Sequence, residues 1–219
     1  GLGDVYKRQG MLCSENELNL SNESDGIVEL KNRESEIGKS YFILKLIKDI
    51  IGNGGKAFYM AGEDSNWLLQ SRLKQLSVGG RDFINHRGRE AELAKPENYL
   101  CIIEDILSIQ RFDAVFLDKM HLVLPSKPKR KDDYEYYYNH LPKWAQLAEK
   151  SKCAIVMVHH AKKDNGQPHP NLFQNILEST AITGACDIIL VLHKSDIGPA
   201  YIFDVTGKFT PDKTHCVTK

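Results

Sequence analysis

The segment that most constrains the fold is Asn32 to Ser40, with the apolar run Tyr41 to Ile51 directly after it. A phosphate-binding loop needs a glycine that lets backbone N–H groups approach phosphate, a lysine that reaches the β and γ oxygens, and a hydroxyl for Mg²⁺. Gly38, Lys39 and Ser40 supply these three in order. The segment therefore predicts a phosphate-binding loop that leads into a helix, whose N-terminus carries partial positive charge and favours an anion.

The loop departs from the full motif at its first position. In the pattern G-x-x-x-x-G-K-[ST] the first residue is glycine, whereas this chain has Arg33. The other predicted loop residues are Glu34, Ser35, Glu36 and Ile37. The alternative is a chance G-K-S at the start of a helix, because short motifs give false positives. The strands and carboxylates around the loop have to decide between the two.

Length and composition predict one globular domain. With 219 residues and 42% hydrophobic content the chain can bury a substantial core, and its formal net charge of zero argues neither for nor against nucleic acid. No run reaches the roughly 18 apolar residues of a membrane helix, and no charged-then-apolar leader opens the chain. The five cysteines lack C-x-x-C spacing and three lie in or beside apolar runs, so we expect buried thiols and a reducing cytoplasm.

The ends of the chain are expected to lie outside the core. Residues 1–9 include Asp4 to Gln9, which looks like the translation of a transposon adaptor used in sequencing libraries, so they are interpreted as a processing scar. Residues 10–26 are polar and acidic and predict a flexible lead-in. The domain is expected to span 27–219 and to be truncated, since Lys219 stops the chain in mid-pattern.

Apolar segments on both sides of the loop predict a parallel sheet. Ile27 to Leu30 precedes the loop, and Ala57 to Ala61 follows the glycine-rich stop after the helix. Strand, loop, helix and strand form a βαβ unit, which implies parallel strands. Further strands are predicted near Phe83-Ile84 and at Asp113–Asp118, Cys153–Val158, Ile188–Leu192 and Tyr201–Val205, the last of which could be antiparallel.

Two further segments are expected to be helical in whole or in part. Tyr99 to Ile109 is apolar but mixed in period, and we interpret it as a short strand followed by a helix. Asp132 to Lys150 is predicted to be a helix that carries several tyrosines near its start.

Acidic residues follow two of the predicted strands. Ligands bind beyond the carboxyl ends of parallel strands, so Glu63 and Asp64 should face the loop, where one could polarise water. Asp64 or Ser65 could instead cap the next helix. Asp118 ends an apolar strand and is the predicted partner of Ser40 in holding Mg²⁺. Apolar strands that end in Asp are common, so this signal gains weight only behind a G-K-S loop.

A basic segment and a pair of histidines add candidate contacts. Lys127, Lys129, Arg130 and Lys131 lie ahead of several tyrosines and could contact single-stranded DNA, or could form a solvated loop beside aromatics that pack on the sheet. His159-His160 ends a strand, and neighbours on a strand point to opposite faces, so both cannot ligate one metal. One could bind a terminal phosphate or catalytic water, or be satisfied by nearby carbonyls.

Five segments, taken in order, resemble a RecA-fold ATPase, most closely the RepA-like family of plasmid and phage helicase-type ATPases. They are Gly38–Ser40, Tyr59–Asp64, Phe116–Asp118, Val158–Lys163 and Ser179–Asp187. The resemblance spans about 27–208. It implies an α/β fold in three layers, with a mainly parallel central sheet flanked by helices. It also implies ATP and Mg²⁺ as ligands, and DNA-coupled ATP hydrolysis by a homo-oligomeric, hexameric ring in the cytoplasm with single-stranded DNA in its pore and no membrane contact.

The resemblance also implies roles for individual residues. Glu63 would activate water, His160 would sense the γ-phosphate, and Lys163 would lie beside it. Ser40 and Asp118, the Walker B acid, would hold Mg²⁺. The basic loop and the loop after Lys163 fall where the pore-facing loops of the family would lie.

Departures from the family pattern keep two other functions open. Besides Arg33, Glu178 stands where relatives usually have glycine, and no residue is a clear arginine finger, although Val205–Lys208 is similar to the late strand of the family. One alternative is therefore an ATP-binding scaffold in replication or partition that does not turn ATP over. A small-molecule kinase is less favoured, because after Asp118 the chain has only Arg130 to build an arginine-rich lid.

Overall fold

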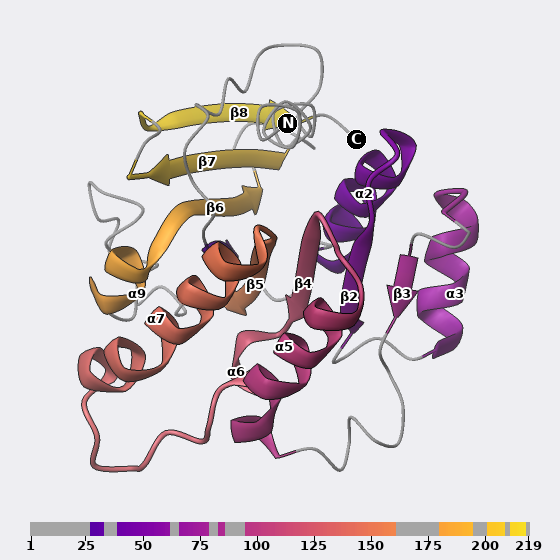
Figure 1. Cartoon of the computed structure of the whole chain (residues 1–219). Helices are drawn as coiled ribbons and strands as arrows, with labels where there is room; N and C mark the ends of the chain where they lie inside the picture. The colour runs from indigo at the N-terminus through magenta and orange to yellow at the C-terminus, as the bar shows by residue number, and fades with distance from the viewer. Residues whose placement is uncertain are drawn as a thin grey trace.

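The described residues form one sheet with helices packed on it (Figure 1). The structure is a computed structural model that describes residues 27–32, 39–61, 66–78, 83–85, 95–160, 180–194, 201–208 and 211–217. The strands are Ile27–Asn32 (β1), Ala57–Ala61 (β2), Phe83–Asn85 (β3), Ala114–Asp118 (β4), Ala154–His160 (β5), Cys186–Lys194 (β6), Tyr201–Gly207 (β7) and Lys213–Val217 (β8). Their order in the sheet is β3-β2-β4-β5-β1-β6-β7-β8.

Most neighbouring strands in this sheet are parallel. β1 pairs with β5 and β6, β4 pairs with β5 and β2, and β2 pairs with β3, all in parallel. β7 runs antiparallel to β6, and β8 antiparallel to β7. A mixed α/β fold with a mainly parallel sheet and a late antiparallel strand is therefore confirmed.

The carboxyl ends of four parallel strands meet at one edge of the sheet. The register pairs Asn32 with His160 across β1 and β5, and Ala61 with Asp118 across β2 and β4. β2 and β4 are buried along their whole length, as the continuous apolar sequence of a parallel strand requires. Residues that directly follow these strands therefore begin at the same edge.

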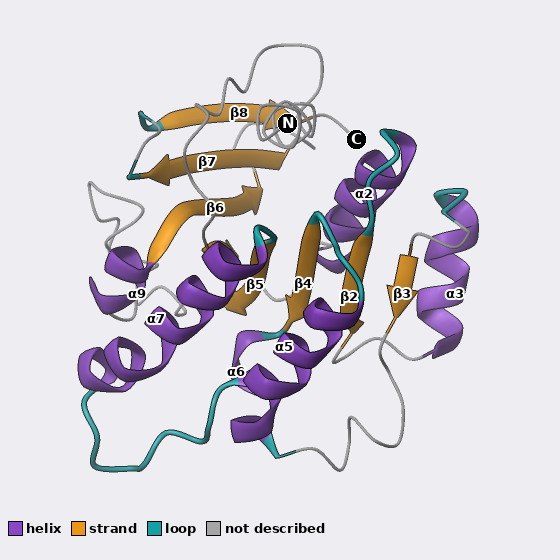
Figure 2. Ribbon diagram, in the orientation of Figure 1, coloured by secondary structure: helices purple, strands orange, loops and turns teal. Residues whose placement is uncertain are grey.

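Seven helical segments connect the described strands. They are Lys39–Gly52 (α2), Asn66–Gln75 (α3), the 3₁₀ turn Pro96–Asn98 (η1), Tyr99–Ile109 (α5), Met120–Val123 (α6), Asp133–Ser151 (α7) and Thr180–Ala185 (α9). The helices after the loop segment and after the basic segment are confirmed close to their predicted bounds (Figure 2).

The interpretation of Tyr99 to Ile109 as a short strand followed by a helix is wrong. The whole segment is the helix α5, and Pro96 opens the 3₁₀ turn ahead of it. Tyr99 and Ile103 are the buried residues of this helix. They are four residues apart and therefore share one helix face, a spacing that the mixed apolar run concealed.

The sheet lies between two apolar clusters, and β2 contributes alternate side chains to each. Phe58 and Met60 join a cluster with α5 and α7 that contains Trp144, buried to 2% exposure. Tyr59 joins a second cluster with α2 and α3 that contains Ile47. Because successive strand residues point to opposite faces, the two clusters lie on opposite sides of β2.

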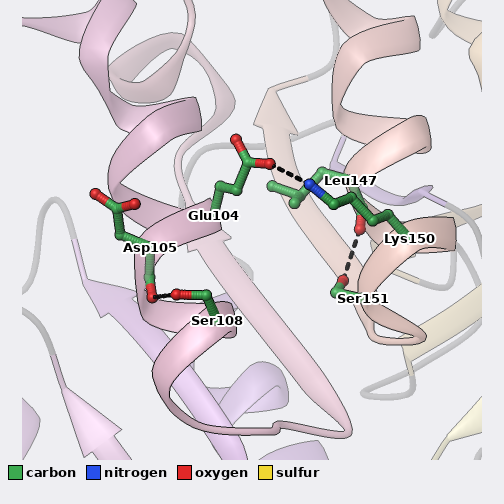
Figure 3. Close-up of polar contacts among 6 residues, drawn as sticks. All are labelled: Glu104, Asp105, Ser108, Leu147, Lys150 and Ser151. Carbon is green, nitrogen blue, oxygen red and sulfur yellow. Dashed lines mark hydrogen bonds and ion pairs between the residues drawn. The ribbon is translucent and has the colours of Figure 1, made fainter.

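Helices α5 and α7 are also joined at the surface. Lys150 Nζ lies 2.7 Å from Glu104 Oε1, and Figure 3 shows the two side chains extending toward each other. The hydrogen bond and charge of Glu104 raise the pKa of Lys150. The pair is exposed, so the apolar cluster beneath it contributes far more to the packing of the two helices.

β7 ends at the edge opposite to the carboxyl ends of β1 and β4. Gly207 pairs with Ile188 near the start of β6, and a Cβ on Gly207 would lie 2.4 Å from the carbonyl oxygen of Asp187. Lys208 follows, and its Nζ lies 2.9 Å from Asp187 Oδ1. Only glycine lets the two backbones approach this closely.

Two expectations from composition have different outcomes. No helix in the described part of the chain is long and apolar enough to span a membrane. Cys153 and Cys186 are buried, but Cys101 and Cys216 are exposed, so the prediction of buried thiols is wrong for these two. Cys101 lies on the outer side of α5, which the expectation of a strand at that position did not anticipate.

Candidate functional site

The N-terminus of α2 lies at the carboxyl edge of the sheet, a short loop after the end of β1. Lys39 is its first residue and is 8% exposed, and the half-buried Ser40 follows. Ile43 and Ile47 are fully buried one turn apart, which fixes the helix against the sheet. Packing by its apolar face therefore presents the predicted lysine and hydroxyl at this edge.

The structure brings Ser40 and Asp118 together across 78 residues of sequence. Ser40 Oγ donates a hydrogen bond of 2.8 Å to Asp118 Oδ2. Asp118 ends β4 and is only 3% exposed. The two residues predicted to hold Mg²⁺ are therefore in direct contact.

A third side chain reaches the same carboxylate oxygen. The Tyr59 hydroxyl donates to Asp118 Oδ2 at 3.0 Å from the middle of β2, and Tyr59 is fully buried. No role for this tyrosine was predicted from the sequence. Its signal was a phenol inside an otherwise apolar buried strand, since a buried Tyr hydroxyl needs a hydrogen-bond partner.

The buried charges of the described residues gather at this edge. Lys39, Asp118 and Lys119 are the charged side chains buried there, and Lys119 is 7% exposed. Two lysines and one aspartate leave an excess of +1, and charged groups are rarely buried unless they are paired or bind a ligand. The edge is therefore electrostatically suited to an anion such as a polyphosphate.

The donor set fits Mg²⁺ in chemistry. Mg²⁺ prefers oxygen ligands, keeps several waters, and is commonly held by one or two carboxylates together with substrate phosphates. The Ser40 hydroxyl and the Asp118 carboxylate are such oxygens. The described residues contain no cluster of three or more His, Cys, Asp and Glu side chains, which a metal site built from the protein alone would need.

Several predicted site residues lie outside the described residues. They are Arg33, Glu34, Ser35, Glu36, Ile37, Gly38, Glu63 and Lys163. The backbone of His160 is described as the last residue of β5, beside Asn32 of β1, but its side chain is not. Their assigned roles remain predictions.

The basic loop that follows α6 begins at the same edge and leads into α7 (Figure 1). Lys127 pairs with Asp133, and Lys131 Nζ lies 3.1 Å from Glu135 Oε1. From 127 to 135 four basic and three acidic residues give a net charge of only +1. Within the described chain, Lys129 is exposed and has no ion pair, and the same holds for Arg130. These two are the better candidates for contact with a phosphate backbone.

The tyrosines of α7 divide between the two interpretations given to them. Tyr136 and Tyr137 are buried against the sheet at 6% and 7% exposure. Tyr134 and Tyr138 are exposed, and their rings stack with centroids 5.8 Å apart. The apolar packing alternative therefore holds for one pair, and the other pair lies at the surface beside the basic loop.

Comparison with known proteins supports the fold. No family model and no curated protein sequence matches this chain. Among solved structures, the ATPase domain of a replicative helicase is similar, with a TM-score of 0.63 and 13% sequence identity over 88% of this chain and 80% of that one. The chain thus shares the fold of a RecA-like ATPase domain, while its sequence has diverged far from that neighbour.

Proposed function

We propose that this chain is a RecA-type ATPase domain in three layers, which binds Mg·ATP at the carboxyl edge of its sheet and hydrolyses it. The observation that carries the proposal is the contact between Ser40 and Asp118 beside the buried Lys39. A G-K-S sequence that arose by chance would not be expected to face a buried aspartate at the end of a neighbouring strand. The similar fold of an ATPase domain supports the same conclusion.

Each residue of the edge has a defined task in this proposal. Lys39 provides a positive charge for the β and γ phosphates, and Ser40 and Asp118 orient the metal. Mg²⁺, when bound, neutralises charge that develops on the phosphate oxygens. Glu63 is the proposed base that orients water, and His160 with Lys163 would respond to the γ-phosphate.

The proposed partner is single-stranded DNA, bound by a homo-oligomeric ring, with a hexamer as the expected size. This part rests on the family resemblance and on the position of the basic loop at the nucleotide edge. An ATP-binding scaffold without turnover is the second candidate, since Arg33 replaces a glycine of the loop motif.

Lys39→Ala tests the nucleotide site directly. We expect it to abolish tight binding of ATP, because the buried charge at the phosphate position is lost. Lys45→Ala is the matched control on the same helix, where the lysine lies 5.4 Å from the Tyr41 ring centroid and is exposed. Binding of a fluorescent ATP analogue measures the effect, and equal affinity of wild type and Lys39→Ala would contradict the proposal.

ATP turnover, measured with and without single-stranded DNA, separates an ATPase from a scaffold. Glu63→Gln should bind ATP but lose about 10²- to 10⁴-fold in rate, the usual contribution of a general base. A wild-type chain that binds ATP and never hydrolyses it would favour the scaffold.

A further inference from the structure

We infer that Tyr59 is a positioning residue of the metal site: its hydroxyl fixes the Asp118 carboxylate in the orientation that Mg²⁺ binding requires. The inference rests on the proposed function, because it assumes that this edge binds Mg²⁺ with a nucleotide. It adds a residue from a third element, β2, to the pair formed by α2 and β4.

The position of Tyr59 in the sheet makes the contact specific. Tyr59 pairs with Phe116 across β2 and β4, and Asp118 lies two residues further along the neighbouring strand. Residues at i and j+2 on adjacent strands lie on the same face, and an aromatic side chain is long enough to span that diagonal. The phenol thus reaches Asp118 Oδ2 while its ring stays in the cluster with α2 and α3.

Two donors on one oxygen constrain how the carboxylate can turn. Ser40 Oγ approaches Oδ2 from the helix and the Tyr59 hydroxyl approaches it from the neighbouring strand. When Mg²⁺ arrives, Ser40 has to serve the metal as well, and the strand-borne phenol continues to hold the carboxylate. Loss of such a supporting hydrogen bond typically lowers metal affinity 10- to 100-fold.

A purely structural role is the competing explanation. Tyr59 is a large core residue, and its hydroxyl has to bond to some acceptor when buried. A structural hydroxyl would affect thermal stability without changing how nucleotide binding depends on Mg²⁺. A positioning hydroxyl changes that dependence specifically, so the two roles predict different results.

Tyr59→Phe removes the hydroxyl and keeps the ring. Tyr136→Phe is the matched control, because its buried hydroxyl donates to the carbonyl of Pro125, away from Asp118. At fixed concentration of a fluorescent ATP analogue, Mg²⁺ is titrated and the half-saturating Mg²⁺ concentration is read from binding. We expect an increase of about tenfold in Tyr59→Phe and no change in Tyr136→Phe. Affinity for the analogue in EDTA should be unchanged in both.

A second probe keeps the hydroxyl and so does not depend on the stability of Tyr59→Phe. 3-Fluorotyrosine incorporated in place of Tyr59 gives a single fluorine resonance, which should shift when Mg²⁺ is added to the nucleotide complex and stay unchanged when nucleotide is added in EDTA. A resonance that ignores Mg²⁺, or an unaltered Mg²⁺ midpoint in a folded Tyr59→Phe, overturns the inference.

The wild-type titration separates this inference from the proposed function. If the wild type binds the ATP analogue only with Mg²⁺ and the Tyr59 measurements show no response, the positioning role alone is wrong. If the wild type does not bind the analogue at any Mg²⁺ concentration, the proposed function is wrong as well.

Discussion

Close backbone contact at Gly207 makes this residue sensitive to the smallest possible addition. Gly207→Ala would place a Cβ 2.4 Å from the carbonyl oxygen of Asp187, so one of the two strands has to shift. Overpacking of this kind costs about 1–3 kcal/mol, and we expect a corresponding fall in the free energy of unfolding. Gly52→Ala is the control, because nothing lies within 4 Å of its added Cβ. Urea unfolding of both variants measures the difference, and equal stabilities would contradict the predicted clash.

Single residues of the site were predictable from sequence to different degrees. Ser40 and Asp118 were assigned as partners because the loop motif and a strand that ends in Asp both have known chemistry. Tyr59 was missed, since its contact depends on the diagonal between β2 and β4, and the pairing of strands cannot be read from one strand alone. Lys119 was missed for a similar reason, because its burial follows from the fold around β4.

Helix α7 is expected to make the fold sensitive to mild acid through His140. Burial, Lys143 and Lys131 lower the pKa of His140 below its usual value of 6.5. The unfolded chain therefore binds this proton more readily, and stability falls as the pH drops from about 6.5 through the lower pKa of the folded state. Above that window the histidine is neutral in both states and has no such effect.

The loss of melting temperature between pH 7.5 and pH 5.5 should be smaller in His140→Gln than in wild type. His121→Gln, at an exposed histidine on α6, is the control and should keep the wild-type difference. Thermal melts followed by circular dichroism at both pH values measure it. An acid sensitivity that persists in His140→Gln would place the titrating group elsewhere.

The basic loop is expected to act through only part of its charge. Lys129 and Arg130 are exposed without ion pairs among the described residues, while Lys127 and Lys131 pair with acids on the first turn of α7. Each phosphate contact with a single strand contributes about −0.7 to the slope of log K against log salt.

Replacing Lys129 and Arg130 with Gln should flatten that slope by about 1.4, provided that both contact phosphates. The same change at Lys127 and Lys131 should have a smaller effect, because these two charges are already partly neutralised. Fluorescence anisotropy with labelled single-stranded DNA at several salt concentrations measures both slopes. ATP binding should survive in each variant, and equal slopes in all proteins would leave the loop as a solvated surface.

Elements with a clear period were predictable, and those without one were not. β2 and β4 were predicted because they are short apolar runs beside turn or acidic signals. α5 was misread because apolar residues lie on much of its circumference, and β8 was not predicted because its sequence, Lys-Thr-His-Cys-Val, is half polar. An exposed strand such as β8 is defined by its hydrogen bonds to β7 more than by its side chains.

The molecule as a whole is expected to unfold as one cooperative unit. The two apolar clusters share β2, β4 and β5, so neither can persist after the sheet is lost. Leu141→Ala on α7 and Leu44→Ala on α2 each remove a fully buried side chain from a different cluster. Each should lower stability by about 2–5 kcal/mol and shift a single transition.

Two probes test this cooperativity in a Trp67→Phe background, which removes the tryptophan that is 76% exposed. Trp144 fluorescence then reports the cluster with α7, and circular dichroism reports the whole chain. If Leu44→Ala shifts the dichroism transition and leaves the Trp144 transition in place, the two clusters unfold separately.

The chain order of the strands differs from their order in space, and this has a consequence for how the protein is made. β5 lies between β1 and β4, although it is synthesised after both. Until residue 160 has left the ribosome, β1 has neither of its parallel neighbours, and Ser40 cannot be held opposite Asp118 across 78 residues. The nucleotide site is therefore a late product of folding, and a nascent chain that stalls earlier is expected to gain no protection from ATP in the cell.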